Sequence, residues 1–445
     1  MREIDLMKRS LLATMLFFVF SIGFTQSNRQ LQNFRNHLQA EGQTGIDSTA
    51  DQINYQPRGQ LNYFYPLFQL FKQEKKFRNL FSDNGYYDEL SQAVSFTEDY
   101  ESALLFQEKT YDSSLSETSR RQIAKVIKDM KNVQHVDARK YISFICRNVQ
   151  VIMVNEAHNN PLHRAFTISL LEDLFRKGYR YLALEMLNNF SNHQLDKLTP
   201  LTGHYCTEPV AGELVRIALQ IGYHLISYED TLAAEHTATQ RDSIQAENIY
   251  RVIQADPSAR ILVHAGYGHI AENNLTMNYV PMAMAFKKIS GIDPLTIDQT
   301  DMTEYSRFAF GKFFYDAYLE KFPITESSIA LIDDQPINPT NNALYDLAVI
   351  HPRTTYRDSR PTWLSLSGRR QALYIKPPNK NVFFVQAYYQ FETFGNIPAQ
   401  VIPADQTYIP NSKGNYLMYL QRGKYIIVFR NMDYKIINTQ HIEVN

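Results

Sequence analysis

The sequence predicts an α/β protein with a mostly parallel sheet and flanking helices, preceded by a helical region and followed by a small antiparallel β domain. Between residues 147 and 299, short β-branched runs alternate with amphipathic segments, as in βαβ units. Residues 61–140 carry aromatic and aliphatic residues at three- and four-residue spacing, which is typical of packed helices. After residue 340, aromatic or branched residues alternate with polar ones between turn signals such as NSKGN, which is typical of antiparallel strands.

The elements of the central region follow one another in a regular order. NVQVIMV (148–154) is a short apolar run and predicts a buried strand, whereas HRAFTISLLEDLFRKG (163–178) is amphipathic, ends in glycine and predicts a helix. The same reasoning predicts further strands at 179–186, 223–229, 259–266 and 293–299, and further helices at 208–222, 237–254 and 281–291.

The length of the chain indicates how many domains it has, and its net charge disfavours one class of function. A chain of 445 residues is long enough for two or three domains, and 44% hydrophobic residues fit a globular protein with a large core. Lysine plus arginine (45) nearly cancels aspartate plus glutamate (46), so the formal charge is -1. Proteins that grip a nucleic-acid backbone normally carry a basic excess, so we expect no nucleic-acid partner.

The N-terminus has the layout of a secretory signal peptide. Arg2, Lys8 and Arg9 precede an uncharged apolar run at 11–24, and polar residues follow at once. This run is shorter than the roughly 20 residues that a membrane span needs, although an uncleaved anchor is the alternative. We therefore expect an extracytoplasmic protein, periplasmic or secreted, with no membrane span after signal removal.

These patterns divide the chain into five segments. The expected segments are a signal peptide at 1–26, a polar linker at 27–60, an α/β domain with its N-terminal helical region at 61–299, a connector at 300–340 and a C-terminal β domain at 341–445.

The chain has two cysteines, Cys146 and Cys206. They could pair in an oxidising compartment. However, Cys146 lies in the apolar run YISFICRNVQ, which is typical of a core strand, and free buried thiols are common. Sequence alone does not fix the pairing.

Acids and histidines gather where the predicted strands end. Ligands bind outside the carboxyl ends of the strands in open parallel sheets, so these residues predict a polar site at that edge. The strand ends carry Glu156 with His158, Glu185, Glu229, and His264 followed by Tyr267 and His269.

Glutamate and histidine at close range favour water as the nucleophile. Such a set supports general acid–base catalysis, or it can ligate a divalent metal that activates water. The chain lacks a G-x-S-x-G elbow, an H-E-x-x-H pair and a phosphate-binding G-x-x-x-x-G-K-[ST] loop, and neither cysteine has a catalytic context. The glycines of GYGH (266–269) would let backbone N–H groups approach a substrate oxygen.

Four ordered segments resemble the superfamily of erythromycin esterases, ChaN-type haem-binding lipoproteins and Tiki proteases. These segments are VIMVNEAHNNPLHRAF, GYRYLALEM, TQRDSIQAENI and ILVHAGYGHI, and the resemblance covers about residues 147–299. It implies that Glu156, His158, Glu185 and His269 line a functional pocket, which Arg241 enters from a helix, with His163, His264 and Tyr267 nearby. The family usually has glycine where this chain has Asn155, which changes the backbone freedom expected at that turn, although asparagine tolerates left-handed geometry.

Three functions remain open. The first is a hydrolase of ester or amide bonds acting on a small molecule or peptide, with His158 or His269 as the general base and Arg241 binding a carboxylate or an oxyanion. Glu156, His158, Glu185 and His269 would be the ligands if a divalent metal takes part. The second is a haem-binding protein that uses Tyr267 and its neighbouring histidines. The third is a binding protein with a degenerate pocket.

Overall fold

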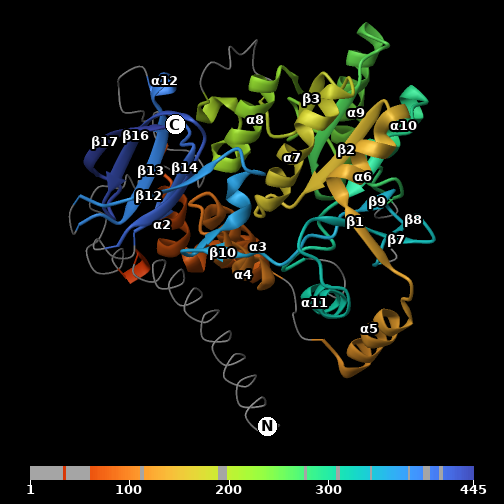
Figure 1. Ribbon diagram of the computed structural model, residues 1–445, viewed down its shortest axis with the longest axis horizontal. Helices are drawn as coiled ribbons and strands as arrows, with labels where there is room; N and C mark the ends of the chain where they lie inside the picture. The colour runs from red at the N-terminus through yellow and green to blue at the C-terminus, as the bar shows by residue number, and fades with distance from the viewer. Residues whose placement is uncertain are drawn as a thin grey trace.

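The computed structural model describes most of the chain (Figure 1). The described residues are 34–36, 61–110, 115–188, 198–274, 278–306, 311–340, 343–378, 381–393, 401–409 and 414–445. The expected signal peptide and most of the expected linker lie outside these residues. None of the helices in the described ranges is long and apolar enough to cross a membrane.

A six-stranded parallel sheet forms the centre of the molecule and confirms the predicted α/β class. Its order is β4-β3-β5-β2-β6-β9, and every neighbouring pair is parallel. The strands are β2 (Val151–Glu156), β3 (Tyr181–Leu184), β4 (His224–Ser227), β5 (Ile261–Gly266), β6 (Leu295–Asp298) and β9 (Leu347–Ala348).

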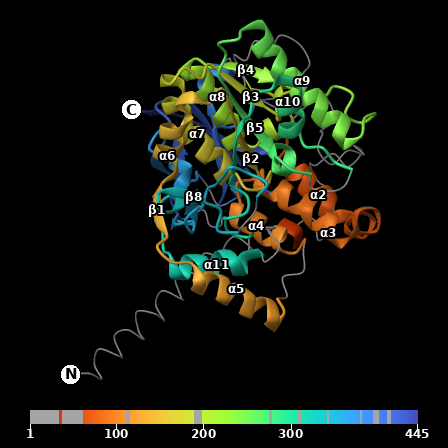
Figure 2. The same cartoon turned by 90° about the vertical axis from the view of Figure 1, so that its right-hand side faces the viewer.

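Helices cover both faces of this sheet, as Figure 2 shows. One layer contains α6 (Ala138–Ile145), α7 (Leu162–Arg176) and α8 (Pro209–Ile221), and the other contains α9 (Ala238–Ala255) and α10 (Met282–Ser290). The alternation of side chains along β2 serves both layers: Ile152 and Val154 pack with the first, and Val151 and Met153 with the second. A central strand is therefore apolar at nearly every position, which is why its sequence is a continuous apolar run.

The predicted strand around Cys146 is wrong. This cysteine follows directly after α6, in a short 3-10 turn, Cys146–Asn148. Within YISFIC, Ile142 is fully buried whereas Phe144 is 63% exposed. The segment is therefore an amphipathic helix end, and a short apolar run cannot be assigned from its composition alone. Cys146 and Cys206 are both buried free thiols, so they do not form a disulfide.

The segment expected to be a connector contains regular structure of its own. Strands β7 (Ser328–Ile332) and β8 (Gln335–Ile337) form an antiparallel sheet with β1 (Gln134–Asp137), in the order β1-β7-β8. Helix α11 (Gly311–Lys321) lies beside α5 (Glu117–Asp129), and Lys321 Nζ donates to the Ile127 carbonyl at 2.6 Å. Strand β9 then joins the edge of the parallel sheet beside β6.

The C-terminal region forms small antiparallel sheets. The larger has the order β14-β13-β16-β17, and β12 pairs with β15. The bounds are β12 (Gln371–Ile375), β13 (Phe384–Tyr389), β14 (Asp405–Tyr408), β15 (Tyr416–Leu420), β16 (Gly423–Arg430) and β17 (Ile436–Val444), with the short α12 (Gln390–Thr393) after β13 and the two-residue pair β10 (Tyr356–Arg357) and β11 (Arg360–Pro361) before β12.

The N-terminal helices share a core with this C-terminal sheet. They are α2 (Phe64–Lys72), α3 (Glu74–Ser95) and α4 (Tyr100–Glu108), and they lie below the sheet in Figure 1. The Phe64 ring lies 5.0 Å from the ring of Phe384, 6.1 Å from that of Tyr408 and 5.1 Å from that of Tyr434. Two segments more than 300 residues apart in the sequence thus bury their aromatic residues together, which accounts for part of the aromatic excess.

Candidate functional site

The predicted polar edge is present, because the carboxyl ends of β2, β3 and β5 lie side by side. In the sheet register, His264 of β5 lies between Val154 of β2 and Leu184 of β3. All nine residues singled out from the sequence lie at this edge or in the helices and loops beside it. They form two hydrogen-bonded clusters that meet at Gly266.

The first cluster is built around the buried carboxylate of Glu156. Arg164 of α7 holds it in a bidentate pair, with both N–O distances at 2.7 Å, and His264 Nε2 lies 2.7 Å from Oε2. Arg164 is itself fully buried and also binds Glu208 at 3.0 Å. Burial raises the pKa of Glu156, but the charges of Arg164 and His264 outweigh burial and hold it well below its usual range. Glu156 is therefore an ionised anchor.

His158 is the exposed member of this cluster. Its Nδ1 lies 2.9 Å from Glu156 Oε1, and since an ionised carboxylate can only accept, Nδ1 is the donor. The ring stacks on Tyr205 at 4.3 Å and meets Tyr267 edge-on at 5.1 Å. The side chain nevertheless keeps 21% of its surface exposed. Glu156 and the two tyrosines thus fix the ring and its tautomer while leaving part of it accessible.

Gly266 allows the two clusters to approach each other. A β-carbon at this position would lie 2.7 Å from His158 Nε2 and 3.2 Å from Glu185 Oε2. The Gly266 backbone N–H donates to Glu185 Oε2 at 2.5 Å. The Nε2 edge of His158 therefore faces the backbone of β5, close to the Glu185 carboxylate.

The second cluster is built around Glu185 and Arg241. Arg241 of α9 donates to Glu185 Oε1 at 2.8 Å and also pairs with Glu229, which follows β4. The nearest Glu185 oxygen lies 3.5 Å from His269 Nε2. Burial raises the pKa of Glu185, but His269, His158 and Arg241 lower it to about 2. Arg241 thus reaches the Glu185 carboxylate from helix α9.

His269 is held by an aspartate that sequence reasoning missed. Its Nδ1 lies 2.8 Å from Asp242 Oδ1, and the other Asp242 oxygen accepts from the Tyr279 hydroxyl at 2.7 Å and the Met282 N–H at 2.9 Å. Burial lowers the pKa of His269, but the charge of Glu185 and the bond to Asp242 outweigh it and raise the pKa. Glu185 and Asp242 therefore stabilise the protonated form of the ring relative to the neutral one.

His163 and His264 are buried behind the site and do not face solvent. His163 Nδ1 accepts the Ala157 N–H at 2.9 Å, and burial, with a smaller effect of His351, lowers the pKa of His163 well below its usual range. Both nitrogens of His264 have partners, Glu156 at 2.7 Å and Thr167 at 3.1 Å. Both residues hold the strand ends in place.

Asn155 lies within β2 and keeps strand geometry, so no turn forms at this position. Its side chain donates to Asp298 Oδ1 at 2.7 Å and to the Tyr267 carbonyl at 3.1 Å, and it accepts the Gln299 N–H at 2.9 Å. It thereby ties β2 to the ends of β6 and β5. The strained residue is instead Tyr267, which has φ +35° although it is not glycine.

Sequence reasoning missed the residues that reach the site from helices and loops. Arg164 and Asp242 lie on α7 and α9, where a charged residue is normally solvent-exposed, and Tyr205 comes from the 3-10 helix Tyr205–Thr207. The only available signal was proximity in the chain: Arg164 lies in the first turn of the helix after β2, and Asp242 is next to Arg241.

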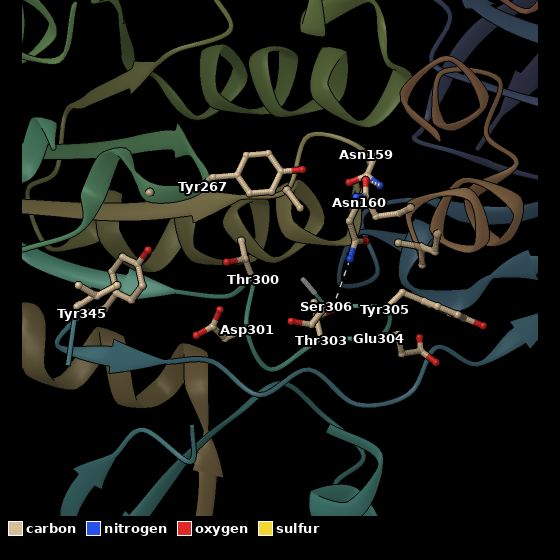
Figure 3. A pocket seen from close by; sticks show the side chains of 15 residues that line it. Asn159, Asn160, Tyr267, Thr300, Asp301, Thr303, Glu304, Tyr305, Ser306 and Tyr345 are labelled. Carbon is tan, nitrogen blue, oxygen red and sulfur yellow. Dashed lines mark hydrogen bonds between the residues drawn. The ribbon is translucent and has the colours of Figure 1, made fainter. Parts of the chain in front are cut away.

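A cavity of about 270 Å³ lies beside the clusters (Figure 3). Tyr267 and Ala157 belong to its wall, so it adjoins the loop that carries His158. Figure 3 shows Tyr267, Asn159 and Asn160 on one side and Thr300, Asp301 and Thr303 on the other. Asn160 Nδ2 donates to Thr303 Oγ1 across the cavity at 3.4 Å.

The side chains do not fit a divalent metal. No group of three or more His, Cys, Asp or Glu residues with the arrangement of a metal site occurs among the described residues. The expected ligands Glu156, His158, Glu185 and His269 have other partners, because Arg164 and Arg241 occupy the two glutamates. A cation bound there would face a guanidinium at close range.

The same side chains are poorly placed to ligate haem iron. Iron needs a ring nitrogen or a phenolate that can turn toward it. Both nitrogens of His264 are engaged, and His269 has Nδ1 at Asp242 and Nε2 3.4 Å from Arg241 Nη1. The cavity is also smaller than the roughly 300–1,000 Å³ of pockets for drug-sized ligands.

Comparisons with known proteins leave the family open. No protein-family model matches the chain, and no curated protein matches it. Among solved structures, the type III effector HopBA1 is similar with a TM-score of 0.28 and 12% identity over 50% of this chain and 97% of that one. Two structures of bacterial protein toxins give a TM-score of 0.28 with 10% identity, over 52% of this chain and 49% of that one, and a TM-score of 0.29 with 12% identity, over 59% and 70%. These TM-scores are too low to carry an argument about fold or activity.

Proposed function

We propose that the protein hydrolyses an ester or amide bond with a water molecule that His158 activates. The observation that carries the proposal is the fixed yet accessible His158 ring. Glu156 accepts from Nδ1 at 2.9 Å, and 21% of the side chain stays exposed. With Nδ1 as the donor, Nε2 is the nitrogen that can accept a proton from water, which is the arrangement of a histidine general base.

Glu156 acts as a positioning residue. Arg164 and His264 keep its carboxylate ionised and fixed, so it can orient His158 and stabilise the imidazolium that forms when His158 takes a proton. Neither Arg164 nor His264 needs to touch the substrate for this role, because both are buried behind the carboxylate.

The second cluster supplies a proton donor and a positive charge. Water oxygen attacks the carbonyl carbon, and its proton passes to His158 Nε2. The bond to the leaving oxygen or nitrogen then breaks, and the leaving group takes a proton from His269, whose raised pKa favours the imidazolium. Arg241 stabilises the oxyanion or binds a substrate carboxylate.

The reaction as written needs one water molecule and side chains of this chain. Haem binding through Tyr267 is the alternative function, and a binding protein with a degenerate pocket is the next. An extracytoplasmic location belongs to the same proposal and rests on the N-terminal sequence alone.

Hydrolysis of a panel of chromogenic esters and anilides tests the proposal. The full chain should hydrolyse at least one of them, and His158→Gln should lower kcat/KM roughly 100-fold or more, because general-base catalysis contributes at least that much. His224→Gln is the matched control, since His224 is exposed at the opposite, amino-terminal end of β4.

Two results would contradict the proposal. One is equal turnover by His158→Gln and the wild type. The other is an absorption spectrum with a Soret band that disappears in Tyr267→Phe, which would favour haem binding. A folded protein that hydrolyses nothing on the panel would favour the binding protein.

A further inference from the structure

A cavity of about 410 Å³ opens between α6, α7 and the segment that precedes β7. Its volume lies within the roughly 300–1,000 Å³ of pockets that hold small ligands. The described residues that line it differ from those that line the smaller cavity of Figure 3. Apolar side chains of α7, such as Phe166, form one wall. We call this cavity the Trp363 groove, and its rim includes Asp137, Arg139, Glu326, Trp363, Ser365 and Ser367.

The wall that contains Trp363 alternates between the core and the groove. Leu364 and Leu366 are buried in the hydrophobic core. Between and beside them, Trp363, Ser365 and Ser367 line the groove. Leu366 and Ser367 have φ +48° and +58°, a left-handed backbone that residues other than glycine seldom adopt. The buried leucines hold this turn in place, so it presents one indole and two hydroxyls to the groove.

Several polar groups of the rim have no partner within the part of the chain that the structure describes. Arg139 forms no ion pair there although it is half-buried, and the side chains of Ser365 and Ser367 make no hydrogen bond. The indole N–H of Trp363 has no acceptor either, and its nitrogen is not sealed from solvent. These groups can therefore bond a ligand without breaking a bond of the fold.

The charges around the groove balance each other. Asp137 and Glu326 are acidic and Arg139 is basic, and Lys140 Nζ lies 3.4 Å from Asp137. Two charges of each sign give no net preference for an anion or a cation. Donors and acceptors nevertheless lie on the same rim, because the guanidinium and the indole donate whereas the carboxylates accept. A neutral ligand with several hydroxyl groups satisfies both kinds, since each hydroxyl donates and accepts.

Trp363 gives the groove an apolar surface that is held in place. Tyr100 packs against the indole with the ring centroids 5.1 Å apart, and the indole also contacts the hydrophobic core. A fixed aromatic surface favours a ligand with an apolar face, because little further ordering is needed when the two pack together. A pyranose ring carries C–H groups on its face and hydroxyls around its edge. It therefore matches the apolar wall and the polar rim at once.

We propose that the Trp363 groove binds a neutral saccharide, with one pyranose ring packed on the indole. Arg139 donates to oxygens at the edge of the ring, and Asp137 and Glu326 accept from its hydroxyls. This inference does not rest on the proposed hydrolase function, because His158 is not among the described residues that line the groove.

Trp363 reports directly on the groove, because it is the only tryptophan in the chain. The full chain is titrated with the methyl pyranosides of glucose, galactose and mannose, and with cellobiose and diacetylchitobiose. Tryptophan emission and its quenching by acrylamide are followed. At least one sugar should saturate with a Kd of about 1 mM or below and protect the indole from acrylamide. Sorbitol has similar hydroxyls but no ring, so it should bind at least about tenfold more weakly.

Variants then locate the binding site. Arg139→Gln and Ser365→Ala should each weaken binding of the best sugar about tenfold, as the loss of one hydrogen bond to the ligand predicts. Arg147→Gln is the matched control, because Arg147 is an exposed arginine that follows the other end of α6 and is not part of the groove. It should leave sugar binding unchanged. If one variant does not fold, the other variant and the comparison of ligands on the wild type still decide.

Adenosine and alanine test two other classes of ligand. Adenosine would stack a planar base on the indole, and alanine, a zwitterion, would use Arg139 and Glu326 together. The proposal is overturned if either of them, or sorbitol, binds as tightly as the best sugar. It is also overturned if no sugar gives a saturable change up to about 10 mM, or if binding is undiminished in the folded variants. His158→Gln should bind the sugar as the wild type does, which separates this inference from the hydrolase.

Discussion

At the scale of single residues, the buried ionic pair of Arg164 and Glu156 is the foundation of the site. A charge out of water is tolerated only when partners replace the lost hydration, and here the guanidinium and carboxylate supply two bonds of 2.7 Å to each other. The position of the His158 ring depends indirectly on this pair, because His158 Nδ1 binds the same Glu156 oxygen, Oε1, as Arg164 Nη2.

Replacement of Arg164 should therefore cost both stability and activity. Arg164→Met leaves Glu156 and Glu208 buried without their cation, so we expect a loss of about 3–5 kcal/mol in the free energy of unfolding. Chemical denaturation measures it. Arg176→Met is the control on the same helix, because this side chain is 68% exposed, and it should change stability by no more than about 0.5 kcal/mol. Similar losses of unfolding free energy for the two variants would mean that the buried pair contributes no more to stability than an exposed arginine does.

His269 should make stability depend on pH in a defined direction. Glu185 and Asp242 raise its pKa in the fold against the effects of burial and of Arg241, and Tyr279 also touches the ring. A raised folded pKa gives a contribution that is fully present below the ordinary histidine value of about 6.5 and lost as pH rises through the folded pKa. The difference in unfolding free energy between wild type and His269→Asn should shrink over that rise. A difference that stays constant, or grows, with pH would contradict this assignment.

At the scale of elements, the sequence could place the strands but not the helices' contribution to the site. The apolar runs of β2 and β5 are buried on both faces, so their composition alone marks them, and polar residues after them must lie at one edge. Arg164 and Asp242 could not be found this way. The direction in which these two side chains point depends on how α7 and α9 pack on the sheet. The sequence alone does not tell whether a charged residue on a helix faces the solvent or the site.

The close approach of β5 to His158 should make Gly266 sensitive to a single methyl group. Gly266 has φ -77°, which any residue adopts, so Gly266→Ala adds steric conflict with the His158 ring and no backbone strain. We expect a loss of about 1–3 kcal/mol in stability, as in other overpacked sites, together with displacement of His158 and loss of hydrolysis.

Gly291 provides the opposite case as a control. Its φ is +72°, but a β-carbon would meet nothing within 4 Å. Gly291→Ala should therefore lower stability by about 1 kcal/mol through backbone strain and leave hydrolysis unchanged. Retained activity in Gly266→Ala would show that the His158 ring does not need its present position.

At the scale of the whole molecule, the segments on either side of the parallel sheet are bound to each other and to it. Aromatic packing joins α2 and α3 to the C-terminal sheet, and buried ion pairs join that region to α8. The sequence separates the N-terminal helical, central α/β and C-terminal β regions by their hydrophobic periodicity. It could not predict the contacts between them, because no local pattern indicates that Phe64 packs against Phe384. The same applies to β9, a two-residue strand whose only signal is its place in the sheet.

The buried pair between Arg216 of α8 and Glu392 of α12 offers a direct test of this coupling. The two N–O distances are 2.8 and 2.7 Å, and both side chains are almost fully buried. Glu392→Gln would leave Arg216 underneutralised, with Glu213 at 3.0 Å as its remaining acid, and should lower the free energy of unfolding by about 3–5 kcal/mol. Chemical denaturation followed by tyrosine fluorescence and by circular dichroism measures the loss.

The pair of Arg369 with Glu172 is the matched surface case, since Glu172 is 55% exposed, and Glu172→Gln should lower the free energy of unfolding by no more than about 1 kcal/mol. If the C-terminal region unfolds together with the parallel sheet, both signals shift to the same lower denaturant concentration in Glu392→Gln. Two separate transitions, with only one moved, would mean that the C-terminal sheet is stable without α8.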